Sequence, residues 1–173
     1  IGLSYSDDPA YILDLAANTA ALTHGHKLAW ISSGAFALLV SHIVHEELSI
    51  AEALKKTLKA LDNSFPDSLP VVHELMRSIR SAVSLASSAS SDLDAIHSLG
   101  EGWVAKEALA IGLLSALRHE NDIAGAMTFA ANHGGNSNTT AAIAGMLVGA
   151  RIGFNAIPDR FVDRLELVDV ILE

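Results

Sequence analysis

The 173-residue chain is half hydrophobic and acidic, with a formal net charge of −9 and a pI near 5.2. A chain of this size and hydrophobicity can bury one sizeable core, which excludes intrinsic disorder and predicts a single globular domain over residues 1–173. The acidic balance predicts that neither nucleic acid nor a membrane is a partner. The chain has no cysteine, which excludes disulfides and thiolate zinc sites and is compatible with the cytoplasmic location that we expect.

The first half of the chain carries strong helix signals. Strand signals are scarce, and long stretches rich in Ala and Leu take their place, so we expect an all-α fold. A first helix is predicted from Pro9, behind the capping pair Asp7-Asp8, to about Leu22. A second helix is predicted over about residues 27–44. It is apolar almost all round, which is typical of a central helix that packs on several sides.

The uncharged run over residues 28–45 is nearly long enough to cross a bilayer. Its serines, glycine and histidine make it too polar for that role, so we predict a buried core helix. The chain opens on Ile1 and has no charged segment followed by an apolar one, so we expect a trimmed product without a signal peptide.

Further helices are predicted in chain order over residues 49–62, 70–86, 92–99, 102–119, 122–133 and 139–152, with a last one after the turn at residues 157–158. Ser49 and Glu52 form a capping-box pattern, and Gly100 is predicted to stop the helix before it. The serine-rich stretch 87–91 is too short to divide domains.

A polar, glycine-containing segment over residues 132–140 stands between two of these helices. Two adjacent glycines permit a sharp turn and close approach, while short polar side chains at positions 136, 138 and 139 could direct oxygens toward one point. That arrangement suits an anion or a hard cation. The alternative is that Asn136 and Ser137 only cap a helix, and composition alone favours that alternative.

Three separated blocks resemble the ADP-ribosylglycohydrolase family. They are NHGGNSNTTAAIAG at residues 132–145, ALTHGH at residues 21–26 and LGEGWVAKEAL at residues 99–109, and they occur in the family's order. The start of the chain, residues 1–3, resembles the stretch just after the family's glycine-rich ligand loop. The resemblance covers essentially the whole chain but about the second half of a family member, so we expect only the C-terminal portion of such a domain.

The resemblance implies an orthogonal helical bundle in which two Mg²⁺ ions hold the ribose end of ADP-ribose. The bound group is released by hydrolysis from a modified protein side chain, often arginine. The metal ligands carry over onto Asn136, Asn138 and Thr139, but the first two are acidic in the family. Because magnesium prefers anionic oxygens, two neutral amides should weaken or abolish metal binding. The family's further acidic ligands, from earlier motifs, have no counterpart here.

The resemblance also implies roles for other residues of the matched blocks. His24 is expected near the ligand phosphates, although a capping or partly buried histidine is the simpler interpretation. Trp103 is expected in the core or at the border of the ligand. The remaining expected ligand contacts are Gly134, Gly135 and Ser137, and the residues expected to support the loop are Asn132, His133 and Glu101.

Three hypotheses remain open. The first is a metal-dependent hydrolase, impaired by its two Asn ligands, that acts on ADP-ribose or an ADP-ribosylated protein. The second is a non-catalytic relative with a structural or ADP-ribose-binding role, as jellyfish crystallins resemble this family. The third, compatible with both, is a chain that folds against a separate N-terminal half, which would cover an exposed apolar surface.

Overall fold

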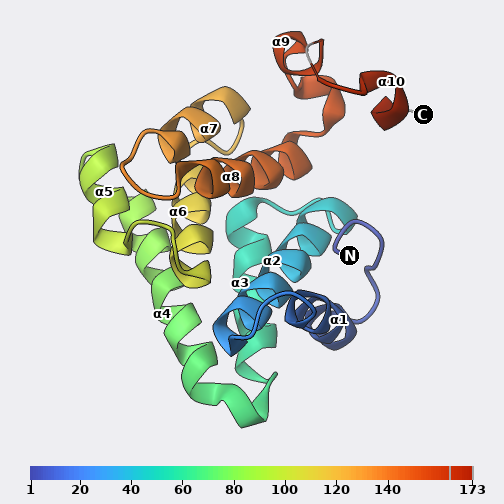
Figure 1. The fold of residues 1–173 in the computed structure, drawn as a ribbon, viewed down its shortest axis with the longest axis vertical. Helices are drawn as coiled ribbons and strands as arrows, with labels where there is room; N and C mark the ends of the chain where they lie inside the picture. The colour runs from blue at the N-terminus through green and yellow to red at the C-terminus, as the bar shows by residue number, and fades with distance from the viewer. Residues whose placement is uncertain (164, 173) are drawn as a thin grey trace.

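The computed structural model describes residues 1–163 and 165–172, and within those ranges it contains helices and no strands (Figure 1). The expected all-α class is therefore confirmed. The helices are α1 (Pro9–Ala21), α2 (Lys27–His45), α3 (Ile50–Asp62), η1 (Pro66–Ser68), α4 (Leu69–Ala86), α5 (Asp92–Leu99), α6 (Ala105–Arg118), α7 (Ile123–Ala131), α8 (Ser137–Ile152), η2 (Phe154–Ala156), α9 (Asp159–Val162) and α10 (Val168–Leu172). Arg164 and Glu173, which belong to the expected domain, lie outside the described residues.

Side-chain caps begin several helices where the sequence predicts them. The Asp8 carboxylate accepts the backbone N–H of Ala10 at 2.9 Å, which opens α1. Ser49 and Glu52 form both bonds of a capping box at α3, and Asp122 caps α7. Each cap satisfies N–H groups that have no partner within the helix, and this fixes where the helix begins.

Helix α2 is the centre of the bundle. It packs against α1, α3, α4, α6 and α8, and its buried residues lie on most sides of the helix. Among the described helices, it is also the one that is long and apolar enough to span a bilayer. However, 61% of its apolar stretch is buried inside the fold. A core helix meets the same criteria of length and composition, and the prediction of a buried α2 is confirmed.

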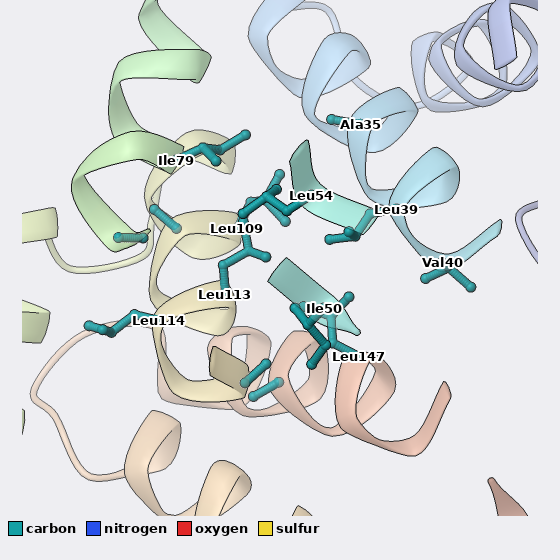
Figure 2. Close-up of a cluster of buried hydrophobic side chains, with 14 of the residues drawn as sticks. Ala35, Leu39, Val40, Ile50, Leu54, Ile79, Leu109, Leu113, Leu114 and Leu147 are labelled. Atoms are coloured by element: carbon teal, nitrogen blue, oxygen red, sulfur yellow. The ribbon is translucent and has the colours of Figure 1, made fainter. Parts of the chain in front are cut away.

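A single cluster of buried side chains joins α2, α3, α4, α6 and α8 (Figure 2). Leu39 from α2, Leu54 from α3 and Leu109 from α6 are each at most 3% exposed. The burial of each such side chain contributes roughly 1.5–3 kcal/mol to the free energy of folding. This cluster holds α2, α6 and α8 together, and these three helices carry the site described below.

Three predicted boundaries are wrong. Helix α6 begins at Ala105 and not at Gly102, because Gly100 and Gly102 have positive φ angles of 120° and 79° that a helix cannot contain. Helix α8 begins at Ser137, two residues before its predicted start, and α7 ends at Ala131, two residues before its predicted end. The expected last helix, after residues 157–158, is divided into α9 and α10, which extend away from the bundle beyond α8 (Figure 1).

Candidate functional site

Two loops distant in sequence are joined by hydrogen bonds. One loop lies before α6, at residues 100–104, and the other lies between α7 and α8, at residues 132–136. The backbone N–H of Asn136 donates to the carbonyl oxygen of Glu101 at 2.7 Å. The side-chain Nδ2 of Asn136 donates to the carbonyl oxygen of Gly102 at 3.1 Å. Because a carbonyl oxygen only accepts, the second bond fixes which end of the amide faces Gly102.

Close contact between the loops requires a glycine at one of the two adjacent positions. A Cβ atom on Gly135 would lie 1.9 Å from the carbonyl oxygen of Glu101, whereas a Cβ on Gly134 would have no atom within 4 Å. Neither residue has a positive φ. The predicted close approach therefore occurs at Gly135, and it results from the neighbouring loop and not from an unusual turn.

A carboxylate holds the loop before α6 in place. Oε2 of Glu107, in the first turn of α6, accepts the backbone N–H groups of Glu101 at 3.3 Å and Gly102 at 3.2 Å. A Cβ on Gly100 would lie 2.5 Å from the Glu107 side chain. The glycines of this loop therefore leave room for the carboxylate and supply the backbone angles that the loop needs.

His133 fixes the second loop. Its Nδ1 accepts the backbone N–H of Gly135 at 3.1 Å, so the ring proton sits on Nε2 and is donated to Thr140 Oγ1 at 3.0 Å. Thr140 is fully buried and its hydroxyl donates to the carbonyl of Ala130 at 2.7 Å. Burial, together with the nearby His97, lowers the pKa of His133. The neutral ring is the form that holds the loop.

The joined loops form one wall of a cleft of about 480 Å³. The opposite wall comes from the segment before α2 and from the first two turns of that helix. The lining residues are His24, His26, Leu28, Ala29, Ser33, Gly102, Trp103, Val104, Ala105, Ala108, Asn136 and Thr139. Among the residues that the structure describes, no carboxylate, lysine or arginine lines the cleft, and its ionisable side chains are the two histidines.

Three helices begin at this cleft. The first turns of α2, α6 and α8 contribute Leu28, Ala105 and Thr139 to the lining. Neither α6 nor α8 has a side-chain cap. Free N–H groups and the helix dipole make a helix N-terminus favourable for anions, at roughly 0.3–1 kcal/mol each where exposed. The α2 terminus is capped by His26, whose Nδ1 accepts the N–H of Leu28, so α6 and α8 are the termini that can offer free N–H groups to an anion.

The structure brings together four of the residues predicted for the site: His24, Trp103, Asn136 and Thr139. Trp103 is 67% exposed, so the expectation that it could be a core residue is wrong, and it borders the cleft. The other predicted residues are not in the lining. Four of them are exposed outside it, namely Glu101, Asn132, Gly134 and Asn138, and the other three are partly buried, namely His133, Gly135 and Ser137.

Several lining residues were not predicted. Ala29 and Ser33 come from α2, and Ala108 comes from α6. Ala29 and Ser33 are four residues apart and therefore share a helix face. A stripe of small residues on that face is the sequence feature that could have indicated this part of the cleft. The same stripe is also typical of ordinary helix packing, so it could not single out a cleft.

The expected magnesium ligands do not fit a magnesium ion by themselves. Oδ1 of Asn136 accepts the hydroxyl of Thr139 at 3.0 Å, so these two oxygens bond to each other. Asn138 is exposed outside the cleft lining. Within residues 1–163 and 165–172, no three His, Asp or Glu side chains are grouped as a metal site. Magnesium requires near-octahedral hard oxygens, of which carboxylates are the strongest in proteins, and this set is neutral.

Comparison with protein families gives one finding. The family model described as ADP-ribosylglycohydrolase matches residues 1–173, the whole chain. No curated protein and no solved structure matches the chain. The all-helical architecture agrees with that family.

Proposed function

The chain belongs to the ADP-ribosylglycohydrolase family, and from this premise we propose that its cleft binds the ADP-ribose of an ADP-ribosylated protein. The family's reaction is hydrolysis of the glycosidic bond between ADP-ribose and the modified side chain, and arginine is the first candidate for that side chain. We propose that this chain is an impaired member of that class because its expected metal ligands at positions 136 and 138 are neutral.

The observation that carries the proposal is the meeting of three helix N-termini at one cleft, of which those of α6 and α8 have no side-chain cap. ADP-ribose contains a diphosphate, and backbone N–H groups at helix N-termini bind phosphate oxygens well. His24 and His26 add imidazole nitrogens that can donate hydrogen bonds. The acidic surface elsewhere repels anions, so a local positive potential is what an ADP-ribose site requires in this protein.

One aromatic ring and several polar side chains in the lining also suit a nucleotide sugar. Trp103 offers a largely exposed ring at the border of the cleft, on which an adenine could stack. Ser33, Asn136 and Thr139 offer hydroxyl and amide groups for a ribose. A cleft of this size is within the usual range for small-molecule sites.

A separate N-terminal half of the same fold is the partner that we propose. A second hollow of about 870 Å³ lies beside the cleft and shares His24 and Ser33 with it. Its other lining residues, from α1, α2, α8 and the two terminal segments, are mostly apolar. Covering this surface, which we call the apolar groove, would stabilise both pieces. We propose a cytoplasmic setting, with neither nucleic acid nor a membrane as partner.

A non-catalytic role in binding ADP-ribose is the second candidate, and one contact favours it. The Asn136 amide donates to the Gly102 carbonyl, which an ionised carboxylate at this position could not do. The side chain present thus suits a loop that is held without a cation, and a metal-dependent hydrolase would not need such an amide.

Calorimetric titration of the chain with ADP-ribose tests binding, first in EDTA and then with Mg²⁺. We expect binding in EDTA, and we expect Trp103→Ala to weaken it by about tenfold, the effect of losing a stacking contact of ~1.4 kcal/mol. Leu22→Ala, an exposed apolar residue outside the cleft lining, is the matched control. A wild-type chain that binds no ADP-ribose at millimolar concentration would overturn the proposal.

A second experiment separates the two candidates. Both Asn136→Asp and Asn138→Asp are introduced together, the N-terminal half is supplied, and release of ADP-ribose from ADP-ribosylated arginine is measured with Mg²⁺. Recovered release indicates an enzyme inactivated by its two amides. Binding without release in the same sample indicates a non-catalytic relative.

A further inference from the structure

We infer that Glu107 is a positioning residue for the cleft: its carboxylate fixes the loop that in turn fixes Asn136, so a series of hydrogen bonds sets the geometry of this wall. The chain of contacts has three members. Glu107 holds the N–H groups of Glu101 and Gly102, and the carbonyl oxygens of those same two residues hold Asn136.

The peptide group that joins Glu101 to Gly102 is bound on both sides: its N–H donates to the Glu107 carboxylate and its carbonyl oxygen accepts the N–H of Asn136. Glu101 and Gly102 direct their N–H groups toward the carboxylate and their carbonyl groups toward Asn136, so movement of the carboxylate would move both carbonyl acceptors. A carboxylate that accepts two N–H groups makes charge-assisted bonds, which are stronger than bonds between neutral groups. Glu107 is only partly buried and is not itself a lining residue, and its carboxylate accepts the N–H of Gly102, which is one.

The close contact of Gly135 makes this arrangement sensitive to position. The space for a Cβ atom at Gly135 is filled by the Glu101 carbonyl, whose location depends on the Glu107 carboxylate. On the other side, Asn136 holds Thr139 through its Oδ1. Glu107 thus acts, through two intermediate residues, on two of the polar groups that line the cleft, Asn136 and Thr139.

The test measures amide hydrogen exchange of Asn136 by NMR in the full chain, alongside the affinity for ADP-ribose in EDTA. Glu107→Ala should increase exchange of the Asn136 N–H by about tenfold or more, since its acceptor loop is released, and weaken ADP-ribose binding by a similar factor. Glu107→Gln keeps a carbonyl oxygen of the same reach and should restore most of both properties. Asp62→Ala removes an exposed carboxylate at the end of α3, outside both loops and the cleft lining, so it should change neither.

The outcomes are separable. If the Asn136 N–H in Glu107→Ala exchanges as in the wild type, or if core amides such as that of Ile79 lose protection to the same extent, the inference is overturned. If Glu107→Ala does not fold, Glu107→Asp, whose carboxylate is one methylene shorter, gives the same comparison with a smaller change. The affinity measurement rests on the proposed function: a wild-type chain without ADP-ribose binding refutes that function, while the exchange result still decides the role of Glu107.

Discussion

The cleft and the apolar groove are neighbours that share His24 and Ser33, yet different interactions define them. The wall of the cleft consists of two loops whose backbone and side-chain groups satisfy one another. The groove consists of side chains on α1, α2 and α8 and on the terminal segments, and some of them, such as Met146 and Phe154, are about half exposed. The cleft is thus specified within the chain, whereas the groove offers apolar surface that only another apolar surface would cover.

Among the substitutions proposed here, a side chain added at one of the two adjacent glycines should disrupt the cleft wall most strongly. Gly135→Ala places a methyl group against the Glu101 carbonyl and should force the loops apart. We expect a loss of about 2–3 kcal/mol in the free energy of unfolding, from overpacking and from the lost Asn136 bond. Urea denaturation measures it. Gly134→Ala, with open space around its Cβ, is the control and should change stability by less than about 0.5 kcal/mol. Equal losses in both variants would contradict the contact.

Asn136→Asp tests the amide contact without changing side-chain size. The variant loses the donor to Gly102 and places a carboxylate beside a carbonyl oxygen, while the N-terminus of α8 partly compensates. We expect a net loss of about 1 kcal/mol in EDTA, measured by urea denaturation. Asn138→Asp lies in the same helical turn, is exposed and should be neutral or slightly stabilising. A stabilised Asn136→Asp variant would show that the amide contact contributes little.

Acidification should loosen the cleft wall through His133. Its pKa is lowered in the folded chain by burial and by His97, only partly offset by the Ala130 carbonyl and Glu101. The unfolded chain therefore binds the proton more readily, so the stabilisation from this residue is complete above its ordinary pKa of about 6.5 and is lost as the pH falls below it.

Urea denaturation at a series of pH values between about 7.5 and 5 measures this loss, in a range above the titration of ordinary carboxylates. His133→Asn should have a flatter profile than the wild type. Identical profiles would indicate that the Gly135 bond to Nδ1 survives protonation, contrary to the geometry.

The smallest effect on folding is expected in the groove. Met146→Glu puts a charge on its half-exposed wall, so the free energy of unfolding should change by less than about 0.5 kcal/mol. Association of the chain with itself or with an N-terminal half should decrease, because the apolar surface is interrupted. Analytical ultracentrifugation measures this association. An unfolding change as large as that of Gly135→Ala would mean that the groove wall belongs to the core.

Local signals in the sequence were sufficient for most of the fold. The capping residues Asp8, Ser49 and Asp122 and the apolar character of α2 predicted helices that the structure contains. The predicted start of α6 is wrong because a single glycine such as Gly102 can be accommodated in a helix, so the sequence alone does not exclude it. In the structure, Gly102 has a positive φ and lies in a loop held by Glu107. The hydrogen bond between Gly102 and Glu107 joins residues five positions apart, and it produces no periodic pattern of hydrophobic residues in the sequence.

The sequence by itself determined the family, the helical class and the two loops that form one wall of the cleft, because blocks of neighbouring residues encode them. Only the tertiary structure decided which members of those blocks matter. Asn136 faces the cleft and Asn138 does not, and Gly135 is confined while Gly134 is free. These distinctions arise because the packing of α6 against α8 brings together groups 34 positions apart, a distance over which no local pattern carries information.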